Sequence, residues 1–142
     1  GLANGGRVVG VIPEHLMRPE VAHQGLTELI VVDSMHTRKQ MMALRSDAFI
    51  VLPGGFGTIE EMFEMLTWLQ LRLQDKPVGL LNVEGYFDSL LQFLEHAANE
   101  GLIRREHRDL LRVEHTPARL LALLAADMAH AQSTHPRNIS LG

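Results

Sequence analysis

The stretch AFIVLPGGFGTIEE, residues 48–61, decides the fold because it reads as a buried strand, a tight glycine turn and the start of a helix. The helix is predicted over residues 58–73, where apolar residues recur with a 3.6-residue period. Gly54, Gly55 and Gly57 let the backbone adopt positive φ angles and approach a ligand closely. Free amides and the positive end of the helix dipole at such a turn suit a phosphate group.

Glu61 and the glycines each have a second, purely structural interpretation. Thr58-Ile59-Glu60-Glu61 matches the capping box, in which Thr58 caps the helix and Glu61 reaches back to its amide. The glycines could likewise serve only to turn the chain. A turn of this kind rarely needs three glycines, which favours a ligand site.

Further strands and helices follow from the same patterns. Near-continuous Val, Ile and Leu is typical of strands buried on both faces of a parallel sheet. Strands that alternate with helices predict an α/β fold with a doubly wound, Rossmann-like parallel sheet. The additional strands are predicted at 7–13, 29–33 and 78–83, and the additional helices at 35–46, at 87–100 and from Thr116-Pro117 onward.

We expect one Rossmann-like nucleotide-binding domain over residues 1–130 and a flexible tail over 131–142. GLANGG at 1–6 reads as the last turn of a helix, and a doubly wound sheet normally has a strand before such a helix. The first strand–helix unit is therefore expected to be missing from this chain.

Polar and turn-forming residues follow the carboxyl ends of the predicted strands. They are Pro13, the run 33–36, the run 53–58 and Asn82. Ligands bind at this edge of open α/β sheets, so we expect the site there.

Composition excludes several other classes of function. The net charge of −4 offers no basic surface for a nucleic-acid polymer or an anionic membrane. The chain has no cysteine, and no two of its eight histidines have the i, i+4 spacing of a metal-binding helix, so no metal site is expected. The densest apolar run, 120–129, is shorter than the ~20 residues of a membrane span. No secretory signal is visible, and we expect a cytoplasmic protein.

PGGFGTIEE at 53–61 is similar to the PGGxGTxxE motif of the LOG ("Lonely Guy") family, and MHTRK at 35–39 resembles its companion arginine-lysine motif. The likeness extends from residue 1 to about residue 115. It implies an enzyme that acts on cytokinin riboside 5′-monophosphate or AMP. Such an enzyme cleaves the N-glycosidic bond of the nucleoside 5′-monophosphate and releases the free base and ribose 5-phosphate, with no cofactor.

The resemblance also implies roles for individual residues and a homo-oligomer. Met65, Trp68 and Leu71 lie off the main apolar stripe of helix 58–73, which either a core on both faces of the helix or a dimer interface explains. We favour the interface and expect a homodimer or larger assembly through this helix. The catalytic pair is implied to be Arg38 and Glu61, and the substrate-binding residues to be Lys39, Gly54, Gly55, Gly57 and Thr58.

Two other functions make different demands on these residues. A non-catalytic nucleotide or cofactor carrier, resembling molybdenum-cofactor carrier proteins, needs the glycine turn but not the pair formed by Arg38 and Glu61. Pyridoxal-dependent lysine decarboxylation needs a Schiff-base lysine and a partner for the ring nitrogen. The chain has only Lys39 and Lys76, and nothing else in it supports a pyridoxal site.

Overall fold

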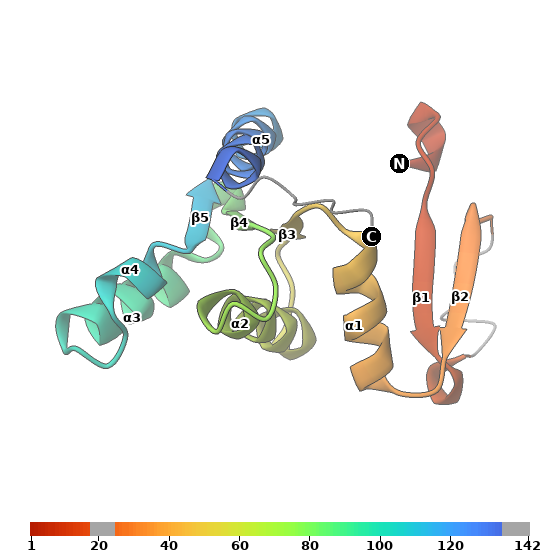
Figure 1. Ribbon diagram of the computed structural model, residues 1–142, viewed down its shortest axis with the longest axis horizontal. Helices are drawn as coiled ribbons and strands as arrows, with labels where there is room; N and C mark the ends of the chain where they lie inside the picture. The colour runs from red at the N-terminus through yellow and green to blue at the C-terminus, as the bar shows by residue number, and fades with distance from the viewer. Residues whose placement is uncertain (18–24, 135–142) are drawn as a thin grey trace, which may run out of the picture. The chain divides into compact units, whose positions relative to one another are not determined.

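The computed structural model describes residues 1–17 and 25–134. The chain forms two compact units, Gly1–Ser46 and Asp47–Gly142. Helices alternate with parallel strands in both (Figure 1), which confirms the α/β class. One domain over residues 1–130 stays a prediction.

The first unit contains a two-stranded parallel sheet. Strand β1 (Val9–Pro13) pairs with β2 (Glu28–Val32) in a register that joins Val9 to Glu28 and Pro13 to Val32. The remaining elements are the short 3₁₀ helices η1 (Leu2–Asn4) and η2 (Glu14–Leu16) and the helix α1 (Met35–Arg45), which packs against β1. The predicted strands and helix of this segment are confirmed to within two residues at each end.

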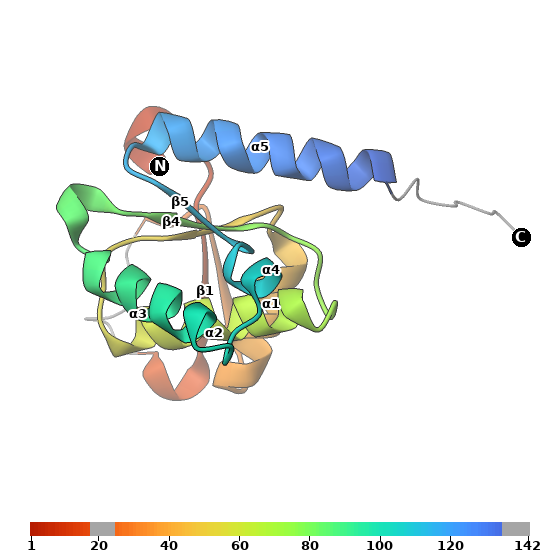
Figure 2. The same ribbon diagram turned by 90° about the vertical axis from the view of Figure 1, so that its left-hand side faces the viewer.

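The second unit contains a three-stranded parallel sheet in the order β3-β4-β5. Helix α5 covers one face of this sheet, and α2 and α3 lie on the other side (Figure 2). The elements are β3 (Phe49–Val51), α2 (Phe56–Gln70), β4 (Val78–Leu81), η3 (Val83–Gly85), α3 (Asp88–Asn99), α4 (Arg105–Arg108), β5 (Leu111–Glu114) and α5 (Pro117–Thr134).

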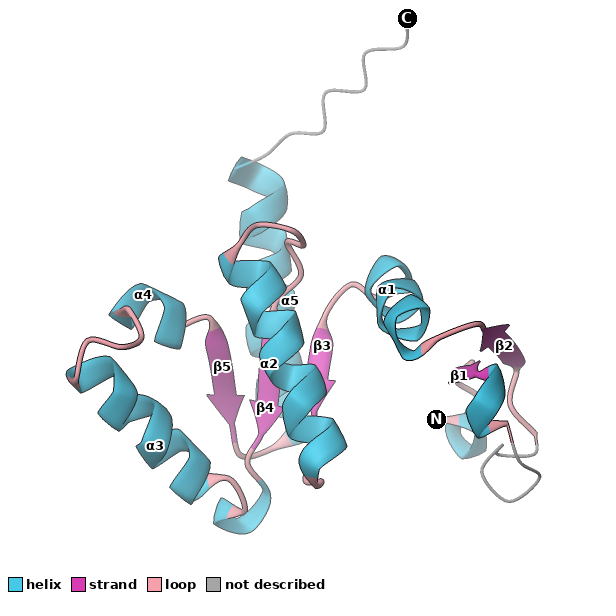
Figure 3. Cartoon of the chain, turned by 90° about the horizontal axis from the view of Figure 1, so that it is seen from below, coloured by secondary structure: helices cyan, strands magenta, loops and turns pink. Residues whose placement is uncertain are grey.

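The core of the second unit lies between the central strand and α5. All four residues of β4 are buried, as its continuous apolar run predicts, and Val78 and Leu80 are fully inaccessible. Leu81 packs with Leu120 and Leu124 of α5, which are each 1% exposed. Seen along another axis, α2 and α5 lie on opposite sides of β4 (Figure 3). This packing fixes the strand whose carboxyl end carries Asn82.

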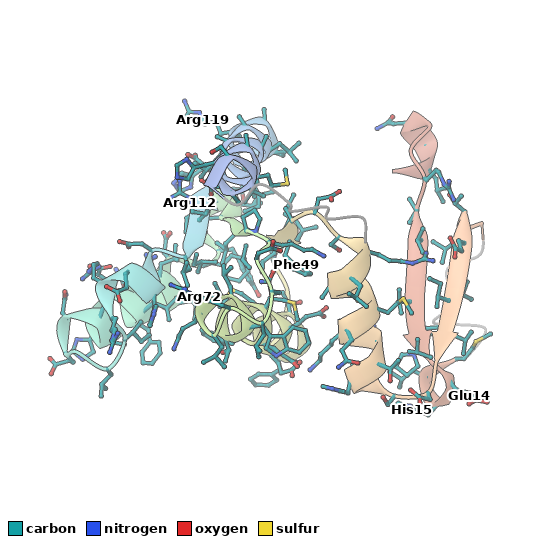
Figure 4. The ribbon with its side chains drawn as sticks, viewed as in Figure 1. Glu14, His15, Phe49, Arg72, Arg112 and Arg119 are labelled. Carbon is teal, nitrogen blue, oxygen red and sulfur yellow. The ribbon has the colours of Figure 1, made fainter. Side chains whose placement is uncertain are left out.

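Three elements among the described residues of the second unit were not predicted, namely η3, α4 and β5. Strand β5 reads Leu-Arg-Val-Glu, and its polar residues interrupt the apolar pattern used to find the other strands. Arg112 is accommodated because its Nε lies 2.9 Å from Oδ2 of Asp127 on α5, and it lies beside that helix in Figure 4. The position of β5 therefore depends on its contact with α5, which apolar periodicity in the sequence does not reveal.

The helix ends show how the sequence sets the element boundaries. Thr116 caps α5, since its carbonyl accepts from the amide of Leu120, and Pro117 is the first helical residue as predicted. Gly101 (φ 76°) follows Glu100, the C-cap of α3, and adopts the left-handed conformation expected there. Helix α5 continues to Thr134 and so includes residues 131–134 of the predicted tail; residues 135–142 lie outside the described residues.

Candidate functional site

The carboxyl ends of β3, β4 and β5 lie at one edge of the second sheet because the three strands are parallel. The residues that follow them are Leu52-Pro53, Asn82 and His115. His115 Nδ1 lies 3.2 Å from the carbonyl oxygen of Asn82, and Tyr86, shortly after β4, reaches the glycine turn after β3. The structure thus brings together the predicted run 53–58 and Asn82, at the edge where ligands bind in such folds.

The predicted reason for three glycines in this turn is wrong. Gly54, Gly55 and Gly57 do not have positive φ angles, and Gly55 has φ −101° and ψ −148°. The turn is therefore made without left-handed backbone. What the glycines supply is the absence of a side chain.

The three glycines meet different surroundings. A Cβ on Gly54 would collide with the Thr58 side chain, lying 2.9 Å from its Cβ and closer still to Oγ1. A Cβ on Gly55 or Gly57 would meet nothing within 4 Å. Gly54 thus allows internal packing, whereas Gly55 and Gly57 leave the backbone at the helix start open to the outside.

The capping-box interpretation of Thr58 and Glu61 is also wrong. Helix α2 begins at Phe56, so Thr58 is its third residue and Gly55 is the N-cap, with no side-chain hydrogen bond. The amide of Ile59 donates to the carbonyl of Gly55 at 3.2 Å. Glycine is an acceptable N-cap residue, which allows the helix to begin before the threonine that the sequence pattern selects.

An earlier helix start changes the surroundings of Glu61. It lies four residues after Gly57, so the two residues share one face of the helix about 6 Å apart along its axis. Helical side chains lean toward the N-terminus, so helix geometry allows the Glu61 carboxylate to reach the open backbone at Gly57. The side chain is half-buried.

Sequence reasoning missed Tyr86. Its hydroxyl donates a hydrogen bond to the carbonyl oxygen of Gly54 at 2.8 Å across 32 residues of chain. A family-independent signal was present in Asn82-Val83-Glu84-Gly85-Tyr86, where a glycine next to an aromatic residue follows a strand at the ligand edge.

Arg38 and Lys39 lie on α1 in the first unit. Ser34 is the N-cap of this helix, and its Oγ accepts from the amide of Thr37 at 3.1 Å. Arg38 Nε donates to the carbonyl oxygen of Val11 in β1 at 3.0 Å, which orients the guanidinium group. Lys39 is only 9% exposed. The pairing of Arg38 with Glu61 joins residues of the two units and stays a prediction.

Asp33 lies at the edge of the first sheet, where β1 and β2 both end. The Thr37 hydroxyl donates to Asp33 Oδ1 at 2.6 Å, and this bond is the main reason why the pKa of Asp33 lies below its ordinary value of 3.8. Glu14 and His15 follow β1 at the same edge (Figure 4). The edge therefore carries several polar side chains.

Two further features of the described residues bear on function. Within residues 1–17 and 25–134, no helix combines the length and apolarity needed to cross a bilayer. In the same ranges no three His, Asp or Glu side chains are grouped so that they could hold a metal ion.

Comparisons with known proteins identify relatives of this chain. Residues 1–124 match the sequence model of the family described as "Possible lysine decarboxylase". The "Probable cytokinin riboside 5'-monophosphate phosphoribohydrolase LOGL2" of Oryza sativa subsp. japonica is 50% identical over 122 residues, which are 85% of this chain and 50% of that protein. A second rice protein, named LOGL1 with the same activity, is 46% identical over 136 residues, 96% of this chain and 61% of its own.

The similarity extends to an Arabidopsis protein. "Cytokinin riboside 5'-monophosphate phosphoribohydrolase LOG1" of Arabidopsis thaliana is 54% identical over 109 residues, 76% of this chain and 51% of that protein. The chain spans about half the length of most of these curated relatives. The family match over residues 1–124 and identities near 50% confirm the resemblance, and the chain belongs to the LOG family.

Proposed function

We propose that this chain hydrolyses the N-glycosidic bond of a nucleoside 5′-monophosphate, either a cytokinin riboside monophosphate or AMP. The products are the free base and ribose 5-phosphate. The observation that carries the proposal is the start of α2, where open glycine backbone and the Glu61 carboxylate share one helix face at the ligand edge of the sheet. The names of the relatives support this class of substrate.

The 5′-phosphate is assigned to the turn formed by residues 54–58. The first amides of an α-helix have no partner inside the helix, and the helix dipole favours an anion beside them. Because Gly55 and Gly57 have no side chain, phosphate oxygens can approach these amides directly. Thr58, the third helical residue, adds a hydroxyl that can donate to the phosphate.

Glu61 acts on the sugar. Cleavage of the C1′–N bond leaves positive charge on the ribose ring, and a nearby carboxylate stabilises that charge in the transition state. The same carboxylate can orient the attacking water or hold the ribose hydroxyls. Its position about one helical turn beyond the phosphate site matches the order of groups along a nucleotide.

Arg38 and Lys39 take part in the proposed reaction through roles that the family resemblance implies. Arg38 stabilises the departing base or holds the substrate and the carboxylate together, and its bond to Val11 keeps the guanidinium in one orientation. Lys39 contributes positive charge toward the anionic substrate. Phosphate binding far from the bond that breaks supplies orientation, so nucleosides without phosphate should react poorly.

The proposal is tested by Glu61→Gln, with Glu60→Gln as the matched control. Glutamine keeps the size and helix propensity of glutamate but removes the charge, so we expect an unchanged melting temperature and a loss in kcat of about 100-fold or more. Glu60 is exposed on the neighbouring helix position, and its variant should keep full activity. The measurement is release of base from AMP and from isopentenyladenosine monophosphate.

Two results would contradict the proposal, the first the role of Glu61 and the second the enzymatic activity. Full activity in Glu61→Gln would remove the carboxylate from the chemistry. Binding of both nucleotides without formation of ribose 5-phosphate by the unaltered protein would instead favour the non-catalytic carrier.

We also infer a homodimer or larger homo-oligomer that uses the end of α2, and a cytoplasmic location. Met65 belongs to the core rather than to an interface, since it is 2% exposed within one chain. Leu71 and Leu73, just after the helix, are 59% and 70% exposed, and Trp68 is half-buried. These side chains, and not Met65, supply the apolar surface for association.

A further inference from the structure

Tyr86 forms a contact between two loops at the ligand edge of the second sheet. Its hydroxyl donates to the carbonyl oxygen of Gly54 at 2.8 Å, although the two residues follow different strands. Tyr86 is 57% exposed, so the phenol lies at the surface beside the glycine turn and is not part of the core. Burial in the core therefore does not explain why this hydrogen bond is formed.

The loop that presents Tyr86 is fixed at its base by Asn82, which is 1% exposed. The side-chain carbonyl of Asn82 accepts from the amide of Phe87 at 2.9 Å, and its Nδ2 donates to Asp88 Oδ1 at 2.7 Å. Its own amide donates to the carbonyl of Glu114 in the neighbouring strand segment. Asn82 therefore ties the loop to the sheet and to the start of α3.

The turn within the loop has one defined conformation. Glu84 has φ 49° and Gly85 has φ 72°, so two successive residues are left-handed. A Cβ on Gly85 would lie 2.5 Å from Asp88 Oδ2, so only glycine fits there. The Tyr86 ring packs edge-on against Phe87 with centroids 4.9 Å apart, and Phe87 is 2% exposed. These contacts hold the phenol in position independently of its hydrogen bond to Gly54.

The hydrogen bond from Tyr86 constrains the peptide of the turn whose orientation is least restricted by its own residues. Gly54 and Gly55 both lack a Cβ, so the peptide between them can rotate more freely than any other in the turn. The peptide is planar, and its N–H points opposite to its carbonyl oxygen. A hydrogen bond from Tyr86 to the Gly54 carbonyl therefore fixes the direction of the Gly55 amide, and it also polarises that amide as a donor.

We propose that Tyr86 is a positioning residue, which orients the Gly54–Gly55 peptide so that the Gly55 amide and the start of α2 converge on the 5′-phosphate. This role rests on the proposed function, because it concerns the phosphate end of the same site. It assigns a contribution to binding the phosphate, and none to breaking the glycosidic bond. Loss of the hydroxyl should weaken phosphate-bearing ligands and leave kcat nearly unchanged.

The first experiment compares Tyr86→Phe with the unaltered protein. This substitution removes one oxygen atom and keeps the ring contact with Phe87, so we expect an unchanged melting temperature. The dissociation constants of ribose 5-phosphate and inorganic phosphate, measured by calorimetry, and the KM for AMP should each rise on the order of tenfold. The kcat for AMP should stay within about twofold.

Gly85→Ala is the second variant because it disturbs the turn while keeping the phenol. It should raise the same dissociation constants, and in combination with Tyr86→Phe it should add little, since both act through one hydrogen bond. Gly79→Ala in β4 is the control for lost stability alone, because its Cβ would meet Leu120 and not the loop. It should lower the melting temperature without changing phosphate affinity.

Unchanged affinity for ribose 5-phosphate and inorganic phosphate in Tyr86→Phe would overturn the positioning role, as would additive effects of the two loop variants. A lower kcat with unchanged KM would also overturn it. Failure of the proposed reaction is recognised separately, since no base would then be released by the unaltered protein while phosphate binding could still be compared between variants.

Discussion

Gly54, Gly55 and Gly57 lie within one turn of chain, but only Gly54 is required by neighbouring atoms. The Thr58 side chain occupies the space where its Cβ would lie. A Cβ on either of the other two glycines would meet nothing within 4 Å. The difference separates a glycine that packing requires from two that packing does not require, and it can be measured.

We expect Gly57→Ala to weaken substrate binding without weakening the fold. The added methyl group would meet no atom within 4 Å, and alanine is favoured over glycine in a helix by up to about 1 kcal/mol. The melting temperature should therefore be unchanged or higher. The same methyl would block the approach of phosphate, and the KM for AMP should rise about tenfold or more. Thermal unfolding and steady-state kinetics provide the two measurements.

Gly54→Ala should show the opposite balance, with a loss of about 1–3 kcal/mol in unfolding free energy from the collision with Thr58. Equal losses of stability in the two variants would show that Gly57 is also structural, and would withdraw the open backbone as support for a phosphate site.

A second residue-scale prediction concerns Asp33 and pH. The Thr37 hydroxyl lowers the pKa of Asp33, so the native state prefers the ionised carboxylate. The resulting stability is present above the unfolded pKa, close to 3.8, and is lost as pH falls through the lowered native pKa. Thr37→Val should raise the pKa of Asp33 toward its ordinary value, as followed by NMR titration of the side-chain carboxyl carbon.

The control for this prediction is Thr37→Ser, which keeps the hydroxyl and should keep the low pKa. The difference in unfolding free energy between Thr37→Val and the unaltered chain should be present at about pH 6 and shrink in strong acid. A pKa of Asp33 that is the same in all three proteins would assign the shift to another group.

At the residue scale, the sequence placed the glycine turn correctly between a strand and a helix, but it gave partly wrong reasons for the glycines. The motif located residues 54–58 at the carboxyl end of a strand, which the structure confirms. The predictions of positive φ angles and of a capping box were wrong because both were inferred from residue types in the local sequence. Helix α2 instead begins at Phe56, with Gly55 as its N-cap. Tyr86 was missed because its bond to Gly54 spans 32 residues, and no local pattern reports such a contact.

At the scale of elements, apolar periodicity predicted the long helices and the buried strands well. It failed for α4 and β5, which are four residues each and carry several charged residues. Strand β5 owes its place to pairing with β4 and to packing beneath α5, including the contact of Arg112 with Asp127. Short polar strands depend on their neighbours, which a single segment does not reveal.

The packing of α5 on β4 gives the element-scale prediction. A Cβ on Gly79 would lie 2.7 Å from Cδ1 of Leu120 and 3.0 Å from Cδ1 of Leu124. Gly79→Ala should therefore push α5 away from the sheet and cost about 1–3 kcal/mol of unfolding free energy. Chemical denaturation monitored by circular dichroism measures this loss.

Leu120→Val, which removes the closest methyl group, should make Gly79→Ala less costly than it is in the unaltered chain, so the double mutant should be more stable than the sum of the two losses predicts. Strictly additive losses would mean that Gly79 is kept for a reason other than contact with α5.

At the scale of the whole molecule, the residues that the family resemblance implicates belong to both units. Arg38 and Lys39 belong to the first unit, and the glycine turn and Glu61 to the second. The two sequence motifs predict which residues take part in the proposed reaction, because each motif lies at a defined position at the start of its own helix. They do not give distances between units, which depend on packing over the whole chain, nor do they give the number of copies that associate.

Association through the end of α2 is the prediction at this scale. In a two-fold assembly each substitution is present twice at the same interface, so an acidic residue there places two like charges close together. We expect Leu71→Asp combined with Leu73→Asp to shift the protein toward a monomer in sedimentation velocity, with an unchanged fold because both side chains are exposed. An interface of ordinary size buries about 1,200–2,000 Å², and the four carboxylates that the double variant places there would outweigh much of its stability.

Leu121→Asp on α5 is the matched control, since Leu121 is 57% exposed and lies on the opposite side of the sheet from α2. It should leave the sedimentation coefficient unchanged. An assembly that survives the double substitution at 71 and 73 would exclude the end of α2 as the interface. One that is lost only in Leu121→Asp would assign association to α5, and the exposed leucines after α2 would then need another partner.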